Sequence, residues 1–182
     1  MMSIRATAIL ALAAGVLTFS AQAQAPSDPQ IVGIVVAANQ IDINYANLAL
    51  KKTKDAQVRE FAQQMVTDHT AVQKSVFALG AKLHVTPADS DTSASLKKQA
   101  TETMAHLKTL KGAAFDKAYV DNEVAYHKAV IAAVTTVLIP NAKNAELKSA
   151  LEGVGPMFQG HLEHAEKIQT ALANGTTANH MN

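Results

Sequence analysis

The stretch from Val58 to Leu83 restricts the fold of this chain more than any other part of the sequence. Its apolar residues recur at intervals of three and four, which predicts one buried face of a long α-helix. One position on that face, between Met65 and Val72, is occupied by His69. A polar group that is removed from water needs a partner. The fold must therefore bring another polar or charged group to His69.

Residues 1–23 have the pattern of a secretory signal peptide. Arg5 precedes the apolar run Ala8–Phe19, and the sequence Ala21-Gln22-Ala23 matches a small-x-small cleavage site. The apolar run is too short for a typical membrane span. We predict cleavage after Ala23 and a periplasmic or secreted destination. An uncleaved N-terminal anchor is the alternative.

The composition of the remaining chain excludes several classes of function. The predicted signal holds one of the 16 Lys and Arg residues and none of the 15 Asp and Glu residues, so the rest has no formal net charge. Nucleic-acid binding is not favoured, because it is typical of a basic excess. The absence of cysteine excludes disulfides, thiolate chemistry and a lipid-anchor cysteine. We expect no integral membrane segment after signal cleavage, and no particular protein partner is indicated.

The rest of the chain divides into three parts. Residues 24–28 are predicted to be a mobile leader, residues 29–173 a helical domain, and residues 174–182 a disordered polar tail. Asp28 and Asp55 are the expected N-caps of the first two helices. The expected helices cover residues 29–52, 56–84, 92–110, 113–139 and 142–172.

The connections predict how these helices pack. The short link at residues 53–55 makes the first two helices antiparallel neighbours. A polar loop leads into the helix at 92–110, which we expect to cross the end or side of the bundle. Pro140 is expected to end the next helix, and Gly153, Gly155 and Pro156 to kink or split the last one. The predicted fold class is all-α, a ferritin-like antiparallel four-helix bundle with an additional crossover helix.

Each of the four main helices carries one ionisable residue on its apolar face: Asp42, His69, His127 and His161. Counted from the connecting turn at 53–55, Asp42 and His69 lie at nearly the same height. His127 and His161 are offset by about two turns unless the break in the last helix shortens the path. Three imidazoles and one carboxylate suit a zinc, iron or copper ion.

Other residues are secondary candidates for this site, as further ligands or as groups that orient the ligands: Asp68, Asp116, Tyr119, Glu123 and His164. A polar core without metal is the alternative interpretation. In that case His69 hydrogen-bonds Asp42, and His127 hydrogen-bonds a tyrosine or His161.

Four stretches resemble the exported bacterial family known as domain of unknown function 4142, namely AANQIDINYANLAL (37–50), VREFAQQMVTDHT (58–70), FDKAYVDNEVAYHKAVI (115–131) and HLEHAEKI (161–168). The resemblance implies a ferritin-like fold and export, with the outer membrane as a further possible destination. It places the family's helix-one acid at Asp42, where glutamate is more usual, and its Asp-His pair at Asp68 and His69. The later family histidines fall on His127 and His161.

The resemblance brings no established activity, and the chain departs from the di-iron ferritin pattern. That pattern needs a glutamate three residues before the histidine on two helices. Val66 precedes His69 and Phe158 precedes His161 at these positions. A carboxylate di-iron centre is therefore disfavoured.

Three functions remain open at the level of sequence. The leading hypothesis is an exported helical bundle without established catalysis, which binds one transition metal ion in its core and acts in envelope stress. One alternative is a metal-free periplasmic interaction module. The other is a metal-dependent enzyme, which we favour less than binding without catalysis.

Overall fold

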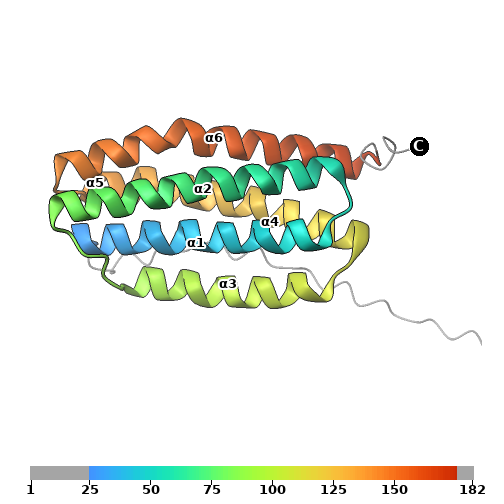
Figure 1. The fold of residues 1–182 in the computed structure, drawn as a ribbon, viewed down its shortest axis with the longest axis horizontal. Helices are drawn as coiled ribbons and strands as arrows, with labels where there is room; N and C mark the ends of the chain where they lie inside the picture. The colour runs from blue at the N-terminus through green and yellow to red at the C-terminus, as the bar shows by residue number, and fades with distance from the viewer. Residues whose placement is uncertain (1–24, 176–182) are drawn as a thin grey trace, which may run out of the picture.

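The computed structural model describes residues 25–175, and that part of the chain is all-helical (Figure 1). The prediction of an all-α fold is therefore confirmed. The predicted signal peptide and residues 176–182 of the predicted tail lie outside the described residues. The bundle consists of long helices that run side by side, so residues far apart in the sequence meet at one height in the core.

Helices α1 (Asp28–Lys52) and α2 (Ala56–Leu83) are joined by a short turn and pack as antiparallel neighbours. The predicted cap of α2 is confirmed, because Asp55 Oδ1 accepts hydrogen bonds from the backbone N–H groups of Gln57 and Val58 at 2.9 and 3.1 Å. The predicted cap of α1 is wrong. Ser27 precedes that helix, and Asp28 is its first residue.

Asp28 has a long-range role instead of a local one. Its two carboxylate oxygens accept hydrogen bonds from the backbone N–H groups of Lys143 and Asn144, at 2.8 and 2.9 Å. These donors lie just before α6 (Ala145–Ala173). The carboxylate therefore ties the start of the first helix to the start of the last one.

Helix α3 (Asp91–Thr109) lies along the side of α1, outside the four main helices (Figure 1). Lys52 Nζ donates to the backbone oxygens of Leu107 and Lys108 and so holds one end of α3. At the other end, the loop before α3 crosses α1 at Gly33. A Cβ atom at Gly33 would lie only 2.0 Å from the Ala88 carbonyl oxygen, so the loop can approach only because this residue is glycine.

The third main helix continues past the predicted break. It comprises α4 (Gly112–Ala133), a π-helical turn η1 (Val134–Leu138) and a final turn α5 (Ile139–Asn141). Proline lacks an N–H group and crowds the carbonyl four residues earlier in an α-helix. In η1 the Ile139 N–H donates to the Val134 oxygen, five residues back. This wider turn accommodates Pro140 inside the helix instead of ending it there.

The predicted split of the last helix is also wrong, because α6 runs from Ala145 to Ala173 as one element with Pro156 inside it. Pro156 lies on an exposed part of the helix. The carbonyl four residues earlier belongs to Glu152, which is also exposed, so this part of the helix can be hydrated and the proline is tolerated there. A Cβ atom at Gly153 or Gly155 would meet nothing within 4 Å, so no close approach requires glycine at either position.

Candidate metal centre

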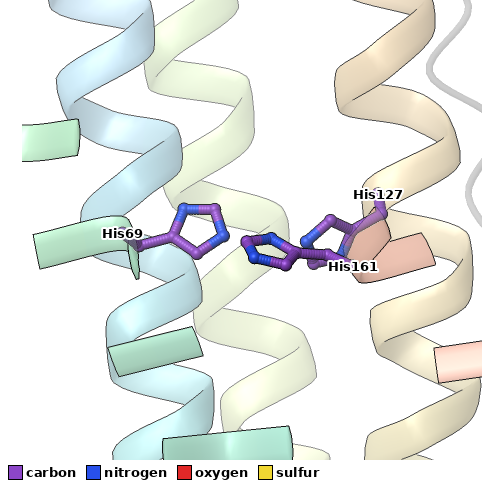
Figure 2. A group of neighbouring side chains, drawn as sticks. All are labelled: His69, His127 and His161. Atoms are coloured by element: carbon purple, nitrogen blue, oxygen red, sulfur yellow. The ribbon is translucent and has the colours of Figure 1, made fainter. Parts of the chain in front are cut away.

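Three imidazole rings from three different helices meet in the middle of the bundle (Figure 2). His69 comes from α2, His127 from α4 and His161 from α6, and none is more than 4% exposed. Their ring centroids are 5.3 to 5.7 Å apart in all three pairs. One ring nitrogen of each lies within 4.8 Å of those of the other two.

The expected offset between His127 and His161 does not occur. The prediction counted residues from Pro140, but the connecting turn lies at residues 142–144. Asn141 ends the third helix 14 residues after His127, and Ala145 begins α6 16 residues before His161. The two rings are therefore almost level, with 5.4 Å between their centroids.

Asn39 on α1 determines which nitrogen of His69 carries the proton. The Asn39 side-chain N–H₂ donates to the Val35 carbonyl at 2.8 Å, so its oxygen must face the imidazole. His69 Nδ1 lies 2.9 Å from that oxygen and donates to it. Nε2 is consequently the nitrogen with a free lone pair, and it points to the centre of the cluster.

The other two rings are oriented in the same way, by an oxygen that accepts a hydrogen bond from one ring nitrogen. His127 Nδ1 donates to the backbone carbonyl of Glu123 at 3.0 Å. His161 Nε2 donates to Asp68 Oδ2 at 2.8 Å. The nitrogens that remain, His127 Nε2 and His161 Nδ1, are buried without a hydrogen-bond partner, as is His69 Nε2. Metal-bound histidines in proteins are generally held in this way.

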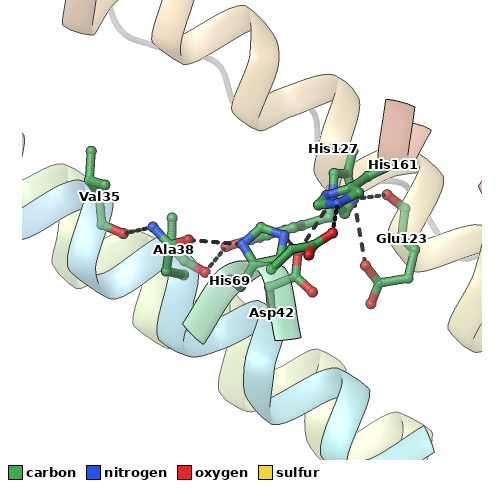
Figure 3. A network of polar contacts seen from close by, with 10 residues as sticks. Val35, Ala38, Asp42, His69, Glu123, His127 and His161 are labelled. Atoms are coloured by element: carbon green, nitrogen blue, oxygen red, sulfur yellow. Dashed lines mark hydrogen bonds and ion pairs between the residues drawn. The ribbon is translucent and has the colours of Figure 1, made fainter. Parts of the chain in front are cut away.

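Asp42 brings a carboxylate from α1 into the same centre (Figure 3). It is completely buried, and its Oδ2 lies 3.2 Å from His69 Nε2 and 3.5 Å from His127 Nε2. Glu123 is also completely buried, with a carboxylate oxygen 3.6 Å from His127 Nδ1. All four oxygens of these two carboxylates lack a hydrogen-bond donor. Asp42, Glu123 and His127 form a second group whose ligand atoms lie within 4.8 Å of one another.

Burial sets the protonation states in this centre when no cation is bound. It raises the pKa of Asp42 to about 8 and that of Glu123 well above its usual value. It lowers the pKa of His69 to about 3 and that of His127 to about 4. Asp42 and His69 therefore have the spacing of an ion pair, but both are uncharged near neutral pH.

A single proton on Asp42 cannot provide a hydrogen bond to every unpartnered nitrogen and oxygen of this centre. A protonated Asp42 can donate to His69 Nε2, which pairs those two residues. His127 Nε2, His161 Nδ1 and the Glu123 oxygens still have no donor. A metal cation instead accepts electron pairs from several of these atoms at once, as zinc does in nitrogen–oxygen sites. The donor set therefore fits a metal ion better than it fits a proton.

The structure separates the secondary candidates. Asp68 orients His161, and Glu123 lies beside His127, as described above. The Tyr119 hydroxyl is buried without a partner, and its ring stacks on Phe115. Asp116 and His164 belong to neither group of potential ligands among the described residues. His164 Nδ1 instead lies 3.0 Å from Gln64 Oε1.

Sequence reasoning missed Asn39. It lies three residues before Asp42, on the same buried side of α1, and is only 3% exposed. An amide at this spacing from a buried acid was the available signal.

Within residues 25–175, one helical stretch, Gly112–Asn141, has the length and apolar composition of a membrane span, with a mean hydropathy of 1.2. The core helix of a soluble bundle has the same properties. This stretch carries Glu123 and His127 into the bundle core, where both are buried. The absence of a membrane segment after signal cleavage stays a prediction.

The fold and the site together define an all-helical bundle protein with a buried histidine–carboxylate cluster. The sequence profile described as domain of unknown function (DUF4142) matches residues 14–168. The chain therefore belongs to this family, as its motifs indicated. No curated protein and no solved structure matches it.

Proposed function

We propose that this protein is an exported, ferritin-like helical bundle that binds one transition metal ion in its core. The ligands are His69, His127, His161 and Asp42. The observation that carries the proposal is the convergence of three imidazole nitrogens, each buried, unpartnered and oriented by a hydrogen bond on its far side. Two short connections and one long crossover between the main helices support the ferritin-like arrangement.

Zinc is the first ion to test, with iron and copper as the other candidates. Three imidazoles and one carboxylate are a common zinc ligand set, and the same donors are used by iron and copper proteins. Asp42 must lose its proton to act as a ligand. Binding should therefore release a proton and become stronger as the pH rises.

A zinc titration of the metal-free protein without its signal peptide tests the proposal. We expect one zinc ion per chain and a rise in melting temperature. At free zinc 100 times the dissociation constant, the added stability is about 2.7 kcal/mol. His69→Ala and His161→Ala should each abolish the rise, whereas His106→Ala on the exposed side of α3 should not. A rise that survives both core substitutions would place the ion elsewhere and refute the proposed site.

The Asn39 amide provides a finer test, because it touches His69 and not the ion. Asn39→Ala removes the acceptor that holds the His69 proton on Nδ1, so zinc affinity should fall by about 10- to 100-fold. Gln40→Ala is the matched control, since Gln40 is the next residue of α1 and is exposed. Equal affinities in the two variants would show that the His69 tautomer does not matter for binding.

A metal-free polar core is the second candidate, and the pairing of protonated Asp42 with His69 favours it. It predicts no zinc effect on the wild-type melting temperature. In that case an interaction module in the cell envelope becomes the leading function.

A further inference from the structure

A cavity of about 510 Å³ lies between the histidine layer and the end of the bundle where α2 ends and α6 begins. Its walls come from all four main helices and from the start of α3. They are built mostly of aliphatic side chains, which include Val35, Val76, Leu79, Val130, Leu151 and Met157. Cavities of roughly 300–1,000 Å³ hold small-molecule ligands in other proteins.

The cavity wall also includes polar groups of the metal centre. Asn39, Asp42, His69 and His127 all contribute to it. No Lys or Arg from the described part of the chain lines the cavity. An occupant would therefore meet an apolar wall along most of its length and a cluster of hydrogen-bond acceptors at the histidine layer.

Most protein interiors are packed without voids much larger than a water molecule. Here several lining residues, such as Val76, Leu79 and Val130, remain only partly buried although they point into the bundle. The π-turn η1 also contributes Val134 and Leu138 to the wall. Turns of this kind occur frequently at functional sites. Apolar surface arranged in this way gains stability when a ligand of similar polarity covers it.

We propose that this cavity binds an uncharged, elongated lipid-like molecule whose terminal hydroxyl reaches Asp42, His69 and His127. The apolar chain matches the aliphatic walls, and a hydroxyl can donate to an imidazole nitrogen or a carboxylate oxygen. An anionic head group is disfavoured, because no Lys or Arg of the described residues lines the cavity to pair with its buried charge. The inference goes beyond the proposed metal binding and does not require it.

The test uses 1-decanol and the protein without its signal peptide, in zinc-free and zinc-loaded form. Binding is measured as displacement of the neutral fluorophore 1-aminoanthracene and confirmed by calorimetry. We expect one saturable decanol site per chain in the zinc-free protein. Decanoate, which has a similar chain and a charged head, should bind roughly tenfold more weakly to that form. Decanoate that binds as well as decanol would overturn the uncharged head group.

Two substitutions fill the cavity from different helices, Val130→Phe on α4 and Val35→Phe on α1. Each should reduce decanol affinity at least about tenfold. Ala132→Phe is the matched control, because Ala132 lies on α4, is exposed and does not line the cavity. Circular dichroism and melting curves identify any variant that fails to fold. If one of the two filling variants does not fold, the decanol affinity of the other one tests the proposal.

Three results would refute the proposal: no saturable decanol binding, equal loss of affinity in Ala132→Phe, or a concentration-dependent dimer that occupies the cavity instead. Zinc binding is measured separately on the same samples. If decanol binds and zinc does not, the metal proposal fails and the cavity proposal stands. If zinc binds and decanol does not, the cavity proposal fails and the metal proposal stands.

Discussion

The two ends of the bundle differ in packing although their helices have the same apolar periodicity. At the closed end, where α1 ends and α2 and α4 begin, Phe61, Phe115 and Tyr119 are completely buried. The Tyr119 ring stacks on Phe115 and meets Phe61 edge to face. At the cavity end, the walls are mostly Val, Leu and Ala side chains around a space of about 510 Å³, with Tyr126 and Phe158 as the aromatic residues in the lining. The histidine layer lies between the two.

This comparison shows that periodicity and packing are separate properties of a sequence. A stripe of small aliphatic residues and a stripe of aromatic residues predict a buried helix face equally strongly. Only the volume of the side chains decides whether facing helices fill the space between them. In this protein three fully buried aromatic rings fill the closed end, whereas the mostly aliphatic walls of the other end leave a space between the helices.

Truncation of a core side chain should show the largest difference in stability between the two ends of the bundle. Phe61→Ala at the closed end should lower the free energy of unfolding by about 3–5 kcal/mol, because it removes a fully packed ring. Leu151→Ala at the cavity end should cost about 2 kcal/mol, because this side chain already borders empty space. Urea unfolding of both variants measures the difference. Equal losses would mean that the two ends are packed alike.

Gly33 is the place where the cavity end is packed tightly. Gly33→Ala should cost about 1–3 kcal/mol, because the new methyl group would meet the Ala88 carbonyl oxygen. The loop before α3 must then move away from α1. Gly160→Ala on α6 is the control, since a Cβ there would meet nothing within 4 Å. A neutral Gly33→Ala in thermal melts would show that this loop is not held against α1.

The histidine layer between the two ends should respond to pH. In the metal-free protein, stability should fall as the pH drops below about 6.5, because unfolded histidines take up protons that His69 and His127 do not accept when folded. The pKa of His161 is lowered as well, so the protons of three histidines oppose the two that Asp42 and Glu123 keep in the folded state. Above about 6.5 the two carboxyl protons dominate, and the Asp42 proton alone should lower stability by about 1–2 kcal/mol on approach to pH 8.

Melting temperatures between pH 4 and 8 measure this profile. Asp42→Asn should reduce the decline on the alkaline side, since an amide has no proton to lose there and Glu123 is then the one carboxyl of the pair that still has a raised pKa. Zinc should reverse the same decline in the wild type, because the ion displaces the proton. An alkaline decline of undiminished size in Asp42→Asn would show that Asp42 does not contribute to it.

The smallest expected effect concerns the part of α6 beside the cavity. Gly153→Ala should raise stability by about 0.5–1 kcal/mol, because alanine favours a helix and the site is exposed. Chemical denaturation resolves such a difference when both proteins are measured together. A loss of stability would indicate that α6 is interrupted at this point, as the sequence suggested.

Much of this protein followed from local chemistry. Apolar periodicity predicted every long helix to within a few residues, and the Asp55 cap was correct because capping depends only on neighbouring backbone groups. The same periodicity predicted that Asp42, His69, His127 and His161 face the core. The errors at Asp28, Pro140 and Pro156 have a common origin. Each residue has a strong local preference, to cap a helix or to interrupt one. At Asp28 a distant partner offsets it, at Pro140 a π-turn does, and at Pro156 exposure to water does.

The amino-acid sequence by itself determined the helices, their buried faces and the four ionisable residues on those faces, because these depend on spacing along one chain. Only the tertiary structure decided that the four residues share one level, that Asn39 sets the His69 tautomer, and that a cavity adjoins them. These properties depend on where the turns place one helix against another and on whether facing side chains fill the space between them. Spacing within a single helix contains neither kind of information.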